Sequence, residues 1–202
     1  VGGDFFDYVD LPNGQFGFML GDVAGKGSPA ALLAAAVLGM FTAEAAHQER
    51  AAPLMTRLNR ALFRRRIEAR FCTTFYGILE PDGSLTYSNA GHNAPVLVTG
   101  DEVRRLEKGG VVLGLFEHAA YDEETVALKP VDVVVAFSDG VTEALNEAGD
   151  EFTDGRLLAA VRAHRHQPPQ AILDGLLADV RAFCGHATPS DDVTMVVMRY
   201  DG

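Results

Sequence analysis

The sequence has few cysteines and lacks the close spacing that most cysteine chemistry requires. Only Cys72 and Cys184 occur in 202 residues, and no C-x-x-C pair is present. Zinc knuckles and dithiol redox motifs need closely spaced cysteines, so the sequence argues against both kinds of site. Isolated thiols are typical of a reducing compartment, and we expect two free, buried cysteines in a cytoplasmic protein.

Positive charge is also scarce. The chain has 17 Lys and Arg residues against 28 Asp and Glu residues, which gives a formal net charge of -11. Phosphate backbones and anionic membranes repel such a surface, so we expect no nucleic-acid partner. Converging carboxylates would instead suit divalent cations.

Hydrophobic runs long enough to cross a membrane are missing. The longest uncharged apolar stretch covers residues 29–43 and ends at Glu44. Spanning a bilayer takes roughly 20 apolar residues. We therefore predict no membrane insertion of this domain, and we interpret this alanine-rich stretch as a helix that packs closely against a sheet.

Internal repeats, linker-like tracts and a secretory signal peptide are not found either, so residues 1–202 are predicted to form one domain. The chain starts at Val1 without a methionine. We expect it to be excised from a longer multidomain protein, in which an upstream sensory or linker segment sets the position of the alanine-rich helix. A homodimer through that helix is left open.

Alternating apolar residues and turn signals predict successive hairpins. Residues 5–11 and 15–23 flank Asn13-Gly14, a strong hairpin signal, and residues 73–80 and 84–91 flank a Pro-Asp-Gly turn. Helices are predicted at 28–47, 53–67, 154–165 and 169–184, and further strands at 94–100, 102–107, 111–116, 121–128, 132–140 and 191–200. Consecutive hairpins favour an α+β fold of two packed, mostly antiparallel sheets with helices outside.

The glycine-rich stretch GDVAGKG at residues 21–27 has the look of a phosphate-binding loop but lacks the required spacing. A P-loop would need glycine where Leu20 stands and Ser or Thr where Gly27 stands. Gly25, Gly27 and Ala30 do match a dinucleotide loop. That loop also needs an acidic residue about 20 positions on, at the tip of a parallel strand, and position 44 lies in a predicted helix. The dinucleotide interpretation is therefore weak.

The informative residue in this stretch is Asp22, at the end of a predicted strand. Other aspartates share this setting, beside an apolar run in a short stretch that contains Gly or Ser: Asp4, Asp7, Asp139, Asp191 and Asp192. Each could be an ordinary turn aspartate. Together they supply the oxygen ligands that Mg²⁺ and Mn²⁺ prefer, and two such ions can share one bridging carboxylate.

Five motifs carry a family resemblance. VGGDFFD, GDVAGKGSPAAL, YSNAGHNAPVL, FSDGVTEA and DDVTMVV occur in the order typical of the PPM-type, metal-dependent serine/threonine protein phosphatases. The chain most resembles their bacterial SpoIIE/RsbU-like branch, from Gly2 to Tyr200. The resemblance implies a four-layer α-β-β-α sandwich of two antiparallel sheets flanked by helix pairs.

The resemblance also implies two Mn²⁺ or Mg²⁺ ions and a set of ligands for them. Asp22 would bridge both ions, the Val23 carbonyl would bind the first, and Asp139 and Asp191 would bind the second. Asp4 and Asp7 would hold metal-bound waters, and Asp192 would support the site indirectly.

The implied activity is phosphoserine/phosphothreonine hydrolysis by attack of a hydroxide that bridges the metals. The implied substrate is a phosphorylated anti-sigma-factor antagonist in a partner-switching pathway. His92 in AGHNAP could act as a general acid, although its turn position favours a structural hydrogen-bonding role. A non-catalytic regulatory binding module of the same fold remains the alternative.

Overall fold

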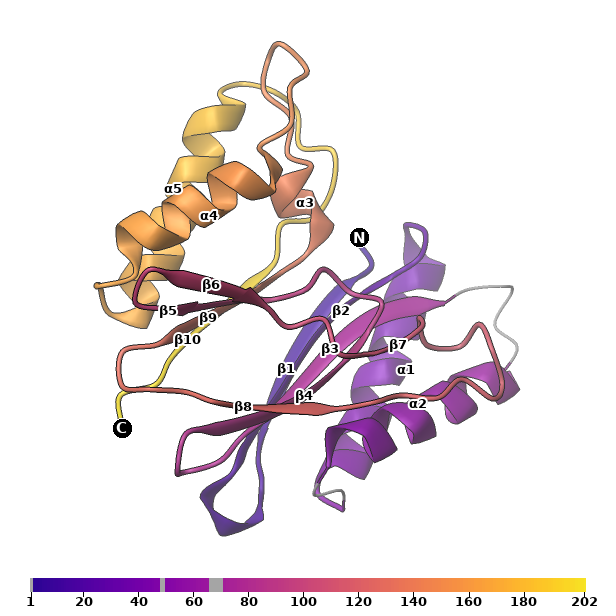
Figure 1. Cartoon of the computed structure of the whole chain (residues 1–202). Helices are drawn as coiled ribbons and strands as arrows, with labels where there is room; N and C mark the ends of the chain where they lie inside the picture. The colour runs from indigo at the N-terminus through magenta and orange to yellow at the C-terminus, as the bar shows by residue number, and fades with distance from the viewer. Residues whose placement is uncertain (1, 48–49, 66–70) are drawn as a thin grey trace. The chain divides into compact units, whose positions relative to one another are not determined.

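A computed structural model describes residues 2–47, 50–65 and 71–202, in which the chain divides into two compact units (Figure 1). Unit 1 comprises the chain up to Ala94 together with Leu106–Leu128. Unit 2 comprises Pro95–Arg105 and Lys129–Gly202. Each unit has one β-sheet and its own buried hydrophobic core.

The sheet of unit 1 is built from the predicted hairpins. Its path runs β1-β2-β3-β4-β7, and β8 pairs with β4; only the β4–β7 pair is parallel. Asn13 and Gly14 both take positive φ angles in the turn between the first two strands, as the hairpin signal predicts. The strands are β1 (Asp4–Asp10), β2 (Phe16–Val23), β3 (Cys72–Leu79), β4 (Ser84–Ala90), β7 (Gly109–Gly110) and β8 (Glu124–Ala127).

Two helices, α1 (Ser28–Ala45) and α2 (Ala51–Arg65), pack against one face of this sheet (Figure 1). By length and composition α1 could span a membrane, a test that core helices also pass. Its buried side chains join the core of unit 1, as the alanine-rich pattern predicts: Ala30, Leu33, Ala34, Val37, Phe41 and Ala45.

The sheet of unit 2 has the order β10-β9-β5-β6 and is antiparallel throughout. A short helix α3 follows β9, and the longer helices α4 and α5 pack against each other. The strands are β5 (Val96–Thr99), β6 (Glu102–Arg105), β9 (Val133–Phe137) and β10 (Met195–Arg199), and the helices are α3 (Asp139–Thr142), α4 (Thr153–His164) and α5 (Pro169–Cys184). The predicted α+β class with two largely antiparallel sheets and flanking helices is confirmed.

Residues 111–116 do not form the predicted strand. Only Leu113 pairs, in an isolated bridge with Cys72, and Gly114 adopts a φ of 87° that interrupts extended backbone. The side chain of Asn59 on α2 supplies the backbone partners that a neighbouring strand would have supplied. Its Oδ1 accepts a hydrogen bond from Gly114 N at 2.8 Å, and its Nδ2 donates to Phe116 O at 2.9 Å.

Two further boundaries differ from the predictions. The second helix begins at Ala51 rather than Pro53, and the carboxylate of Glu123 accepts a hydrogen bond from Ala52 N at 2.9 Å in its first turn. The last strand begins at Met195, so Asp191 and Asp192 lie in the preceding loop. The predicted end of the second helix at residues 66–67 lies outside the described residues.

We expect Asn59→Leu to destabilise the protein strongly. Asn59 is fully buried, and its replacement leaves the Gly114 N–H and the Phe116 carbonyl without their partners. The expected loss is about 2–3 kcal/mol, a fall of roughly 5–10 °C in Tm. Thermal denaturation of Asn59→Leu beside Arg60→Ala, on the exposed face of α2, measures the difference. Equal Tm values for the two variants would contradict this role of Asn59.

Candidate functional site

The first part of the candidate site lies at one end of the β1–β2 pair in unit 1. Asp4 and Asp22 are direct partners in the register of these strands. Residues directly opposite each other in an antiparallel pair point to the same face of the sheet. Two of the predicted carboxylates are therefore neighbours on one face.

Gly3 packs tightly against the oxygens of two candidate ligands, Asp22 and Val23. A Cβ atom built on Gly3 would overlap both Asp22 Oδ1 and the carbonyl oxygen of Val23. The two segments are held together by a hydrogen bond from Val23 N to Gly3 O at 3.1 Å. An anionic oxygen and a neutral oxygen thus converge beside the bare Cα of Gly3, and any other side chain at position 3 would displace them. This donor set suits a hard divalent cation.

Asp7 is not brought together with Asp22. Side chains alternate between the two faces of a strand, so Asp7 shares its face with Phe5 rather than with Asp4. Its carboxylate approaches the hydroxyl of Thr42 on α1 at 3.4 Å. The predicted role of Asp7 near metal-bound water stays a prediction without support from this geometry.

The second part of the candidate site lies in unit 2, where α3 follows β9. Asp139 is the first residue of α3, and a Cβ atom on Gly140 would overlap the Asp192 carbonyl and lie 3.4 Å from Asp191 Cβ. The absence of a side chain at Gly140 therefore lets the backbone beside Asp139 come close to the loop that carries Asp191.

Ser138 links the loop that carries Asp191 to the end of β9 through two hydrogen bonds with Thr194. Its N–H donates to Thr194 O at 3.0 Å, and its hydroxyl accepts a hydrogen bond from Thr194 N at 3.1 Å. Within the loop, Asp192 N donates to Asp191 Oδ1 at 2.9 Å. The main chain of Asp192 thus orients the carboxylate of Asp191, which is compatible with the indirect role predicted for Asp192.

Glu143 is a neighbour of this acidic group that the motif analysis missed. Desolvation, followed by the charges of Asp139, Glu151 and Asp191, raises the pKa of Glu143. Glu143 lies four residues after Asp139 in the motif FSDGVTEA, which is about one helical turn. This spacing alone could have predicted that Glu143 lies near Asp139. Part of this rise comes from neighbouring carboxylates, so negative charge gathers around Asp139 and Asp191.

His92 makes the structural hydrogen bonds that its turn position predicts. Its main-chain N–H donates to Asn89 Oδ1 at 2.7 Å, and Asn89 Nδ2 donates to the His92 carbonyl at 3.0 Å. Its Nδ1 lies 2.9 Å from the hydroxyl of Thr73, which is the β3 partner of Asp22 in the strand register. His92 therefore orders the turn and reaches the strand that neighbours Asp22.

The described ranges contain no group of three His, Cys, Asp or Glu side chains that could hold a metal ion by themselves. Mg²⁺ commonly keeps several waters and takes only one or two protein carboxylates. The oxygens of Asp22 and Val23 in unit 1, and the carboxylates of Asp139 and Asp191 in unit 2, fit such partial ligand sets.

Comparison with known proteins places these features in a family. The family model "Stage II sporulation protein E (SpoIIE)" matches residues 12–201. The chain is 28% identical over 206 aligned residues to phosphoserine phosphatase RsbU of Bacillus subtilis, covering 98% of this chain and 59% of that protein. The chain therefore spans about three-fifths of the length of this curated relative.

Solved structures show the same fold. The SiaA-PP2C domain of Pseudomonas aeruginosa matches with a TM-score of 0.84 and 22% identity, covering all of this chain and 82% of that chain. RsbX, solved in complex with magnesium, matches with a TM-score of 0.69 and 18% identity, covering 98% of this chain and 86% of that chain. The mixed α+β fold predicted from the sequence is thus that of PP2C-type domains.

Proposed function

Since the chain belongs to the SpoIIE family, we propose that it is a metal-dependent phosphoserine/phosphothreonine protein phosphatase. One observation in the structure carries the metal part of this proposal. The bare Cα of Gly3 lets the Asp22 carboxylate and the Val23 carbonyl converge beside it, and Asp4 lies on the same face as Asp22. A phosphatase without a covalent intermediate needs such oxygen ligands more than it needs a nucleophilic side chain.

Each candidate residue then has a defined task. Asp22 and the Val23 carbonyl would hold one Mn²⁺ or Mg²⁺ ion, and Asp139 and Asp191 would hold a second. Divalent ions supply an activated water and neutralise charge on the phosphoryl oxygens. Ser138 and the main chain of Asp192 would keep the Asp191 carboxylate oriented.

The proposed substrate is a phosphorylated anti-sigma-factor antagonist of a partner-switching pathway. Family membership supports this choice, and the similar protein RsbU is named a phosphoserine phosphatase. A chain with a net charge of -11 repels a phosphorylated acidic protein at long range. Productive binding therefore depends on cations at the site and on local positive side chains.

Metal dependence tests the proposed function directly. We expect the protein with Mn²⁺ to hydrolyse p-nitrophenyl phosphate and a phosphoserine peptide, to lose both activities in EDTA, and to regain them when Mn²⁺ is restored. Phosphate release measures all three states. Hydrolysis that persists in EDTA would contradict the proposal. Mn²⁺ binding in isothermal titration without any hydrolysis would favour the regulatory-module alternative.

A further inference from the structure

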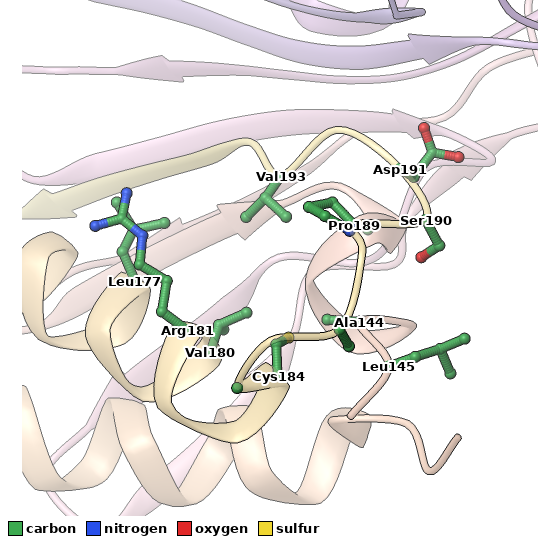
Figure 2. Close-up of a pocket in the computed structure, with 13 residues that line it drawn as sticks. Ala144, Leu145, Leu177, Val180, Arg181, Cys184, Pro189, Ser190, Asp191 and Val193 are labelled. Carbon is green, nitrogen blue, oxygen red and sulfur yellow. The ribbon is translucent and has the colours of Figure 1, made fainter. Parts of the chain in front are cut away.

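Unit 2 contains a pocket that the proposed chemistry does not use. It is a cavity of about 360 Å³ between α3, α5 and the loop that precedes β10 (Figure 2). Its lining is mostly apolar and includes Ala144, Leu145, Val180, Cys184 and Val193. Leu145 and Val193 are 38% and 39% exposed, so the pocket presents apolar surface to solvent.

One end of the pocket adjoins the acidic residues of the candidate site. Asp191 and Gly140 both belong to its lining, and Gly140 directly follows Asp139. Consecutive residues of an extended peptide are roughly 3.3 Å apart. A peptide whose phosphorylated side chain meets a cation on Asp191 would therefore place a residue only a few positions away in the pocket.

The charge at the other end of the pocket differs in sign. Figure 2 shows Arg181 of α5 and Asp191 at opposite ends of the lining. Arg181 is exposed, and the structure gives it no ion pair with any residue in the described ranges. It is also the only cationic side chain among the described residues that line the pocket. An acidic side chain of a bound peptide would find a partner there that no other residue of the pocket lining offers.

We propose that this pocket selects the phosphoprotein substrate by taking up an apolar side chain close to the phosphorylated residue, while Arg181 pairs with an acidic side chain of the same segment. The inference rests on the proposed phosphatase function and adds to it the chemistry of the residues that flank the phosphorylation site. Burial of the apolar side chain supplies affinity, and the ion pair supplies selectivity.

Two peptides of equal length test the selectivity. In one peptide, the residues on each side of phosphoserine are Leu and Glu. In the other peptide, Gly replaces each Leu and Ser replaces each Glu. We expect kcat/KM to be about tenfold higher for the Leu/Glu peptide, the scale of discrimination by one apolar pocket. Leu145→Arg should remove this difference and leave hydrolysis of p-nitrophenyl phosphate within about twofold, because that substrate has no flanking residues.

A charge reversal tests the role of Arg181. Arg181→Glu should favour a third peptide that carries Lys in place of Glu, whereas Arg162→Glu, an equal change of charge at an exposed position of α4, should not. Equal kcat/KM values for all three peptides would overturn the proposal. The proposal would also be overturned if Leu145→Arg lowered kcat/KM equally for the peptides and for p-nitrophenyl phosphate.

Cys184 gives a binding readout that needs no catalysis. The only other thiol, Cys72, is fully buried, and this burial raises its pKa to about 12, so N-ethylmaleimide should react at Cys184 in the pocket. The Leu/Glu peptide should slow this alkylation at least threefold, and the Gly/Ser peptide should not. Absence of hydrolysis with Mn²⁺ would contradict the proposed function alone. Unchanged alkylation in the presence of the Leu/Glu peptide would contradict the docking site itself.

Discussion

Asp22→Asn is expected to lower kcat/KM for Mn²⁺-dependent hydrolysis of p-nitrophenyl phosphate by at least about a thousandfold. The substitution keeps the size of the side chain and removes its negative charge. That charge stands opposite Asp4 and next to the Val23 carbonyl, where the bare Cα of Gly3 lets the two oxygens lie close together. A neutral amide binds a hard cation far less tightly than a carboxylate does.

Asp10→Asn is the matched control for this substitution. Asp10 is exposed at the far end of β1, and the alternation of side chains places it on the same face of the sheet as Asp4. The control changes the net charge equally and should keep its activity and its Tm. Steady-state kinetics and a Mn²⁺ titration of both variants separate loss of a ligand from loss of charge. If Asp22→Asn kept more than a tenth of the activity, the assignment of Asp22 as a metal ligand would be wrong.

More of the fold than of the candidate site could be predicted from the sequence. Hairpins were predictable because Asn13 and Gly14 tolerate positive φ and because apolar residues alternate along the strands. Residues 111–116 were mispredicted because their backbone partners come from Asn59, more than fifty positions away in the sequence. A local pattern cannot reveal a partner that only the folded chain brings close.

Within the site, the differences between sequence and structure have different causes. Asp4 and Asp7 are three residues apart on one strand, so alternation places them on opposite faces, and the role of Asp7 near metal-bound water stays a prediction. Glu143 could have been predicted from its helical spacing to Asp139. The pocket beside Asp191 could not have been predicted from the sequence, because α3, α5 and the loop before β10 contribute to it from separate parts of the chain.

Gly3→Ala tests whether the close approach of Gly3 to Asp22, and not only the charge of Asp22, is required. We expect a fall of about a hundredfold in kcat/KM with Mn²⁺, because displacement of a reacting or ligating group by about 1 Å costs activity on this scale. The new methyl group would overlap Asp22 Oδ1 and the Val23 carbonyl and force both oxygens apart. The variant removes no carboxylate from the site, so the loss would arise from displaced oxygens and not from lost charge.

Gly39→Ala provides the comparison for this glycine. A Cβ atom at Gly39 meets nothing within 4 Å, and its position inside α1 favours alanine by roughly 0.5–1 kcal/mol. That variant should keep full activity and gain slightly in Tm. Weaker Mn²⁺ binding by Gly3→Ala at an unchanged Tm would support the Asp22 and Val23 oxygens as ligands of the ion. Equal activity and equal Mn²⁺ affinity in both variants would instead require that the ion bind Asp22 from its other side, away from the Val23 carbonyl.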